Sequence, residues 1–177
     1  MAAAPRAELD HVSVRAADPV AWAALLGFAP PRAQRIHLAG AYLEVAPEVE
    51  RPLVLIRPDD LSAAADALRA AGFDVRGPSE YTGRDGTWLD LHLDGQPHLA
   101  LTRRTDLDTP WPPPEGDRHP SRARTLRAVH LTGDRDTHRR LTEALDVPGL
   151  LLTDARPGEP LVPIAADCGG GVVVPLT

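Results

Sequence analysis

The chain has 177 residues, 43% of them hydrophobic, which is enough for one domain or two small intertwined modules around a real core. Its formal net charge of -6 argues against broad nucleic-acid binding, and its single cysteine excludes an internal disulfide. The first residues lack the apolar core of a signal peptide, and no apolar run approaches membrane-spanning length. We therefore expect a cytoplasmic protein that does not bind membranes.

An approximate repeat of strand, capped helix and glycine stop begins near the start of the chain. Residues 11–14 predict a short strand. Asp18 is a suitable N-cap for the helix that follows, Pro19 suits its first position, and Gly27 ends it. Residues 35–45 then predict one or two strands.

The second copy of the repeat lies between residues 52 and 73. Residues 53–56 form a continuous apolar run, which is typical of a strand buried on both faces. Asp60 caps the next helix and Gly72 ends it, as in the first copy. A weaker third copy begins at residues 128–131. Such repetition predicts that similar structural units follow one another along the chain.

The clearest hairpin signal follows the second copy. Residues 87–94 alternate strictly, so that Trp88 and Asp90 share one face and leucines occupy the other. A turn at Gly95 leads into a second strand at residues 97–102.

A proline-rich connector is expected to separate this hairpin from the C-terminal part of the chain. The connector, residues 106–121, is too rich in proline and charge for regular structure. Its Trp111 either packs back on the body or lines the mouth of a pocket, and its His119 is expected at the surface. Beyond it we expect a strand, a helix and two short strands, at residues 126–132, 136–145, 150–153 and 172–174.

Polar side chains share one face on several of these strands. His11 and Ser13 lie together on the first strand, and Tyr42 and Glu44 lie together on a later one. His98 belongs to the polar face of the hairpin's second strand. If a strongly curved sheet brings these faces onto one hollow, their nitrogen and oxygen atoms suit Zn, Fe, Ni or Mn. The alternative is that the faces simply meet water, as one face of an antiparallel sheet often does.

Four short motifs together give the chain a family resemblance. They are residues 9–14 (LDHVSV), 25–28 (LLGF), 41–45 (AYLEV) and 84–87 (RDGT). The combination resembles the vicinal oxygen chelate superfamily of glyoxalase I, extradiol dioxygenases and bleomycin-resistance proteins, and most closely its glyoxalase-like branch. The resemblance implies an α+β fold in which paired βαβββ modules form an incomplete barrel.

The resemblance also implies how the chain is divided. The two modules would span residues 8–49 and 52–105, which together make a glyoxalase-like unit at 8–105. The connector would follow at 106–121. Residues 122–177 would form a C-terminal strand-helix-strand extension packed on the same body. The first module is short, with little room for a full set of strands between Phe28 and Val45.

In this family each module supplies one metal ligand from its first strand and one from its last. By resemblance, His11 and Glu44 match the first module's pair. The second module has Leu53 where the first has His11, and leucine cannot bind a metal. With His98 as a third ligand, the resemblance implies an incomplete divalent site in which Glu44 is a general base or ligand and His11 a ligand or proton shuttle.

The preferred hypothesis is a hollow that binds a small organic ligand through Ser13, Tyr42, His98, Trp88 and Trp111. With a metal, the protein would be a lyase, isomerase or dioxygenase. The main alternative is a metal-free, drug-sequestering binding protein on the same fold. Its acidic charge and Trp88 and Trp111 near the pocket walls would suit a cationic, partly aromatic ligand. A third alternative is a degenerate module whose polar face mediates homodimerisation.

Overall fold

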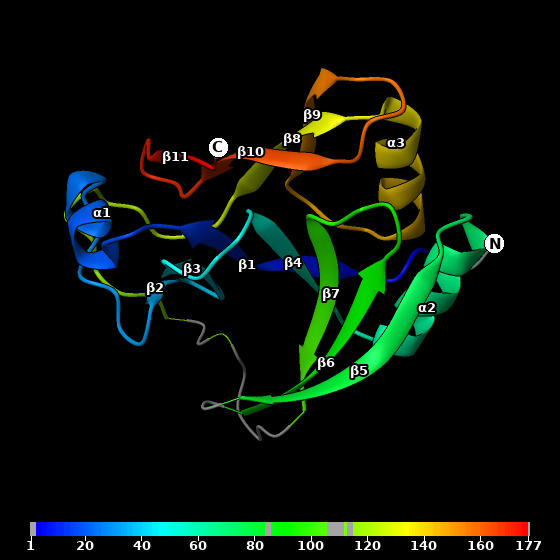
Figure 1. Ribbon diagram of the computed structural model, residues 1–177, viewed down its shortest axis with the longest axis horizontal. Coiled ribbons are helices and arrows are strands. Elements are labelled where there is room, and N and C mark those ends of the chain that lie inside the picture. The colour runs from blue at the N-terminus through cyan, green and yellow to red at the C-terminus, as the bar shows by residue number, and fades with distance from the viewer. Residues whose placement is uncertain (1–2, 84–85, 106–111, 113–114, 177) are drawn as a thin grey trace.

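Two mixed β-sheets and three helices make up the regular structure in the computed structural model, which describes residues 3–83, 86–105, 112 and 115–176 (Figure 1). The expected α+β class is confirmed. The elements are β1 (Ala7–Arg15), α1 (Pro19–Leu25), β2 (Arg35–Leu38), β3 (Ala41–Ala46), β4 (Leu53–Pro58), α2 (Leu61–Ala70), β5 (Val75–Gly83), β6 (Gly86–Leu93), β7 (Leu99–Arg104), β8 (Ala128–Gly133), α3 (Arg135–Ala144), β9 (Leu150–Ala155), β10 (Val162–Asp167) and β11 (Val173–Pro175).

The larger sheet explains the repeat seen in the sequence. Its strand order is β2-β3-β1-β4-β7-β6-β5, with β1 parallel to β3 and β4 parallel to β7. In each half, therefore, the first strand lies beside the last, and the two first strands pair antiparallel at the centre. The first half has β1, α1, β2 and β3, one strand fewer than the expected βαβββ succession, because few residues separate α1 from the end of β3.

Both repeated helices begin and end as predicted. The Asp18 carboxylate accepts a hydrogen bond from the backbone N–H of Ala21, and the Asp60 carboxylate caps α2 in the same way. Gly27 and Gly72 have φ values of 73° and 84°, a region that glycine enters without steric cost. α2 buries an apolar stripe, which consists of Leu61, Ala64, Ala65 and Leu68.

β1 lies in the interior of the larger sheet, between β3 and β4. Val12 from β1 and Val54 and Ile56 from β4 are fully buried on one face and belong to the hydrophobic core. His11 and Ser13 flank Val12 along β1 and therefore point to the other face, which carries a cavity. The same strand therefore supplies both the core and the candidate site.

The C-terminal part forms a four-stranded sheet of its own, ordered β11-β10-β8-β9. The sequence predicts two strands after α3, but the structure has three, because β10 also pairs with β8. Pro163 argues against a strand at this position, since proline cannot donate to a ladder. β10 accommodates it where the register shifts, between Pro163 and Ala165.

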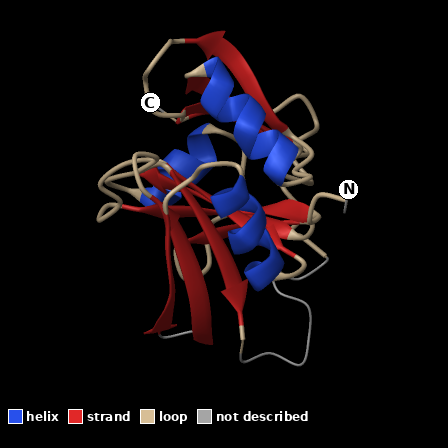
Figure 2. Ribbon diagram, turned by 90° about the vertical axis from the view of Figure 1, so that its right-hand side faces the viewer, coloured by secondary structure: helices blue, strands red, loops and turns tan. Residues whose placement is uncertain are grey.

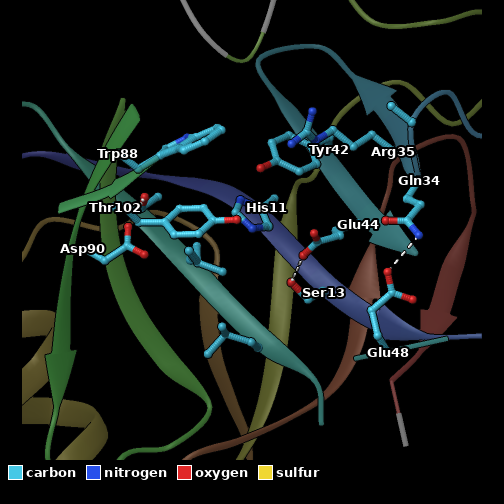
Figure 3. Close-up of a pocket in the computed structure, with 14 residues that line it drawn as sticks. His11, Ser13, Gln34, Arg35, Tyr42, Glu44, Glu48, Trp88, Asp90 and Thr102 are labelled. Atoms are coloured by element: carbon cyan, nitrogen blue, oxygen red, sulfur yellow. Dashed lines mark hydrogen bonds between the residues drawn. The ribbon is translucent and has the colours of Figure 1, made fainter. Parts of the chain in front are cut away.

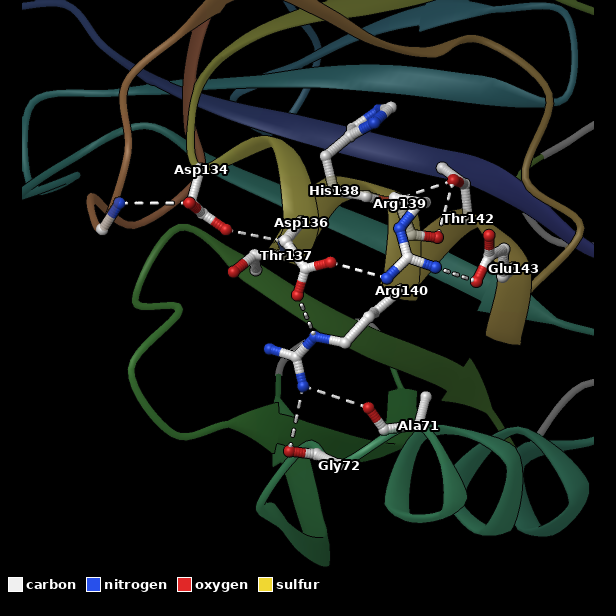
Figure 4. A network of polar contacts seen from close by, with 11 residues as sticks. Ala71, Gly72, Asp134, Asp136, Thr137, His138, Arg139, Arg140, Thr142 and Glu143 are labelled. Carbon is white, nitrogen blue, oxygen red and sulfur yellow. Dashed lines mark hydrogen bonds and ion pairs between the residues drawn. The ribbon is translucent and has the colours of Figure 1, made fainter.

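Arg140 on α3 joins this second sheet to the first (Figure 4). Its guanidinium donates to the carbonyl oxygens of Ala71 and Gly72, at 3.0 and 3.4 Å, just beyond the end of α2. The same group lies 4.8 Å from the centre of the Phe73 ring. A cation at a helix C-terminus satisfies carbonyls that the helix leaves unpaired. Figure 2 shows the two helices on the same side of the molecule.

The described part of the connector is tied to the first half of the chain. His119 is buried rather than exposed, which corrects the prediction from the sequence. Its Nδ1 accepts from the backbone N–H of Ala29, so its Nε2–H is the donor to the carbonyl oxygen of His37, at 2.9 Å. Among the described residues, no helix is long and apolar enough to cross a membrane.

Candidate functional site

A cavity of about 560 Å³ opens on the polar face of the larger sheet (Figure 3). This volume lies in the range of pockets that bind small molecules. Strands from both halves of the sheet line it, together with the turns that flank β2 and β3. The lining residues are His11, Ser13, Ala33, Gln34, Arg35, Tyr42, Glu44, Glu48, Leu53, Leu55, Tyr81, Trp88, Asp90 and Thr102.

Five of the seven residues predicted for the site line this cavity. Parallel pairing of β1 and β3 sets His11 beside Tyr42 and Ser13 beside Glu44. Trp88 reaches the cavity from β6 on the opposite side (Figure 3). Alternation along each strand puts these side chains on its polar face, and the pairing of the strands brings those faces onto one hollow.

The other two predicted residues are not among the cavity's described lining. His98 precedes β7, is half-buried, and has its Nδ1 2.7 Å from the carbonyl oxygen of Pro52. The β4–β7 pairing explains this position, because the row of residues that starts at His11 runs through Leu55 to Ala100. Trp111 lies outside the residues that the structure describes.

His11 is held by the buried carboxylate of Asp10, which the sequence prediction did not include in the site. Asp10 Oδ2 lies 2.7 Å from His11 Nδ1, and Asp10 Oδ1 accepts from Arg57 at 3.0 Å. Neighbours on a regular strand point to opposite faces, so alternation hides this contact. The register with β4 shifts between Leu9 and His11, and this bulge brings the carboxylate to its neighbour's ring.

Tyr42 sits between side chains of the two neighbouring strands. The His11 ring stacks on it with centres 4.3 Å apart and planes 13° apart, and the Arg35 guanidinium lies 5.3 Å from its centre. Burial raises the pKa of the Tyr42 hydroxyl, and the carboxylates of Asp10 and Glu44 add to this effect. Tyr42 therefore contributes a protonated hydroxyl and a ring edge to the cavity.

Among the described residues, three carboxylates line the cavity, and each takes its hydrogen bond from a neutral donor. Glu44 accepts from the Ser13 hydroxyl at 2.6 Å, and Asp90 accepts from the Thr102 hydroxyl at 2.6 Å. Glu48 accepts from the side-chain amide of Gln34 at 2.9 Å. No ion pair within the described chain neutralises any of the three. Arg35 is the single arginine in the part of the lining that the structure describes.

An aromatic pair forms the wall opposite β1. Trp88 on β6 and Tyr81 on β5 have ring centres 5.7 Å apart, and the Arg104 guanidinium lies 5.1 Å from the Trp88 ring. The sequence prediction did not include Tyr81, Asp90 or Thr102 in the site. A signal for Asp90 was present, because it alternates onto the same face as Trp88.

The described residues of the cavity supply few side chains that could bind a metal. Of the predicted ligands, His11 and Glu44 line it, whereas leucines occupy the adjoining positions of β4. Within the described residues, no group of three or more His, Cys, Asp or Glu side chains is arranged to hold a metal ion. Catalytic zinc sites usually have three protein ligands. The two predicted ligands in the cavity, His11 and Glu44, are fewer than such a site needs, so no chemical step through a metal is derived.

The comparisons with known proteins bear on the fold alone. No protein-family model and no curated protein matches the chain. The structure is similar to the crystal structure of a hypothetical protein from Staphylococcus aureus, with a TM-score of 0.50. The match covers 88% of each chain at 10% sequence identity. A likeness at this identity concerns the path of the backbone and says nothing of the cavity's chemistry.

Proposed function

We propose that this chain is a glyoxalase-like protein that binds a small, partly aromatic organic cation in the cavity and needs no metal to do so. The observation that carries the proposal is the set of three carboxylates, from Glu44, Glu48 and Asp90, that face one hollow with neutral partners. Elsewhere in the described chain, carboxylates such as those of Asp10 and Asp136 pair with arginines.

The strand arrangement supports the glyoxalase-like part of the proposal. Two strand-helix-strand halves meet through their first strands, and a polar hollow lies on the face shared by both. This arrangement favours the paired modules that the family resemblance implies, with the first module reduced by one strand. The four-stranded C-terminal sheet is the counterpart of the expected extension.

Charge and shape support the cationic ligand. A unit charge 4 Å from a carboxylate gains about 1 kcal/mol in water and about 4 kcal/mol at the lower effective dielectric near a protein surface. Glu44 is half-buried, so its contribution falls between these limits. The rings of Trp88 and Tyr81 add an electron-rich wall that attracts cations and flat apolar groups.

Tryptophan fluorescence tests the proposal with three probes of similar shape. We expect 1-methylquinolinium to quench the emission saturably, quinoline to bind more weakly, and the anion 1-naphthoate to bind least. Added salt should weaken the cation most. The Trp88→Phe variant is the control that assigns the quenching to the cavity. Equal affinity for the cation and the anion, or no saturable quenching by any probe, would contradict the proposal.

A divalent-metal lyase, isomerase or dioxygenase is the second candidate, and one observation favours it. The bond between Asp10 and His11 is of the kind that orients histidine ligands in metal sites. Elemental analysis of the wild type and of His11→Ala separates the two candidates. Stoichiometric metal that disappears in the variant would favour the metalloenzyme, and equal, near-zero metal in both would remove it.

A further inference from the structure

The turn that leads into β2 has an unusual backbone for its residues. Ala33 and Gln34 both have positive φ, at 48° and 64°. Arg32 and Arg35 exchange two backbone hydrogen bonds of 2.9 Å, which closes a two-residue hairpin turn. Turns with positive φ at both central positions favour Asn-Gly, because other residues are strained there. Here the strained positions carry alanine and glutamine and lie on the rim of the cavity.

The backbone of this turn does not depend on the glutamine side chain. The carbonyl oxygen of Gln34 accepts from the backbone N–H of Val45, which fastens the turn to β3 whatever side chain it carries. Within the described residues, the side chain of Gln34 has one partner, the Glu48 carboxylate, at 2.9 Å (Figure 3). Glycine would suit this backbone better, so a glutamine at this position carries a steric cost.

Glu48 gains a defined position from this contact. It follows β3, is exposed, and lines the cavity's outer part, whereas Glu44 lies deeper and is bonded to Ser13. A glutamate at the surface otherwise spreads over several rotamers, and ordering it on binding costs entropy. The amide of Gln34 takes Oε1 and leaves the second carboxylate oxygen available to a ligand.

We propose, building on the cation-binding function above, that Gln34 and Glu48 form an outer recognition subsite for the ligand's positively charged group. Gln34 is the positioning residue and Glu48 is the residue that touches the ligand. The strained turn is what brings the amide within reach of the carboxylate. The aromatic wall of Trp88 and Tyr81 and the more deeply placed carboxylate of Glu44 receive the rest of the ligand.

The experiment compares four proteins by fluorescence titration with 1-methylquinolinium and neutral quinoline. They are Gln34→Gly, Glu48→Gln, the double variant, and Arg122→Gly as a matched control. Arg122 is exposed, also has a positive φ of 65°, and does not line this cavity, so glycine there relieves the same kind of strain elsewhere.

We expect Glu48→Gln to raise the Kd for 1-methylquinolinium by about fivefold, the factor that an exposed unit charge at contact distance supplies. Gln34→Gly keeps that charge but frees the Glu48 side chain. It should raise the Kd by about two- to fivefold, the cost of ordering one free side chain on binding. Quinoline should bind all four proteins as it binds the wild type. The double variant should be no weaker than Glu48→Gln, because Gln34 acts through Glu48. Both glycine variants should keep or raise the thermal midpoint, by a few degrees at most.

Each possible failure has a separate meaning. If the wild type binds 1-methylquinolinium and Gln34→Gly binds it equally well, the subsite is refuted and the proposed function stands. The subsite is also refuted if the two single effects add in the double variant, or if quinoline weakens together with the cation. If the wild type binds no cation, the proposed function itself fails.

Discussion

Replacing Asp10 with alanine removes a carboxylate that two side chains depend on. The carboxylate is 6% exposed and lies 2.7 Å from His11 Nδ1 and 3.0 Å from the Arg57 guanidinium. Removing one partner of a buried pair typically costs about 3–5 kcal/mol, because the other charge stays buried. Arg57 is 23% exposed and keeps Glu8 at 2.9 Å, so the loss should be smaller, about 2–4 kcal/mol.

Urea unfolding followed by circular dichroism measures this loss. The midpoint should fall without a change in the slope m, and the thermal midpoint should drop by roughly 4–16 °C for a chain of this size. Glu8→Ala is the matched control, because Glu8 is 51% exposed and contacts the same arginine. The Glu8→Ala substitution should lower the free energy of unfolding by less than about 1 kcal/mol. Equal losses in the two variants would refute the view that the buried Asp10 carboxylate holds His11 and Arg57 in place.

Three further predictions concern groups outside the cavity's ligand contacts. Burial, assisted by the charge of Asp167, raises the pKa of Cys168 to about 12, so a thiol reagent at pH 8 should label it only after unfolding; rapid labelling of the native protein would contradict this. Burial chiefly lowers the pKa of His37 below 6.5, so the unfolded chain takes up the proton more readily and stability should fall as the pH drops below 6.5. The His37→Gln variant should show a shallower fall in the urea midpoint over that range, and an unchanged slope would count against the reasoning. Arg140→Met removes the hydrogen bond to the carbonyl of Ala71 but keeps contact with the Phe73 ring. It should lower the free energy of unfolding in urea by about 1–2 kcal/mol. A loss as small as that expected for an exposed ion pair, such as Arg139 and Glu143, would show that this link is unimportant.

Local patterns in the sequence predict much of the fold and part of the cavity. The caps at Asp18 and Asp60 are local features, and the structure confirms them. Strict alternation likewise places His11, Tyr42 and Trp88 on polar faces. These predictions depend on residues within a few positions of each other, where side-chain direction follows from the backbone alone.

The features of the fold and the cavity that local patterns do not predict depend on pairings between strands that are distant in the sequence. The bulge that turns Asp10 toward His11 exists because β1 slips by one residue against β4. The position of His98 follows from where β7 meets β4, and β10 tolerates Pro163 through its own register shift. The rim turn carries Ala33 and Gln34, which give none of the glycine or asparagine signal by which such turns are recognised.

The central pairing of β1 with β4 has a consequence for finding the ligand. Cavity residues come from β1, β2 and β3 on one side of that pairing and from β4, β5, β6 and β7 on the other. Neither half alone encloses the hollow, so a ligand binds only the fully assembled sheet. Under this linkage, a ligand at 100 times its Kd stabilises the whole fold by about 2.7 kcal/mol. A rise in melting temperature is thus a general signal by which a library of compounds can reveal what this chain binds.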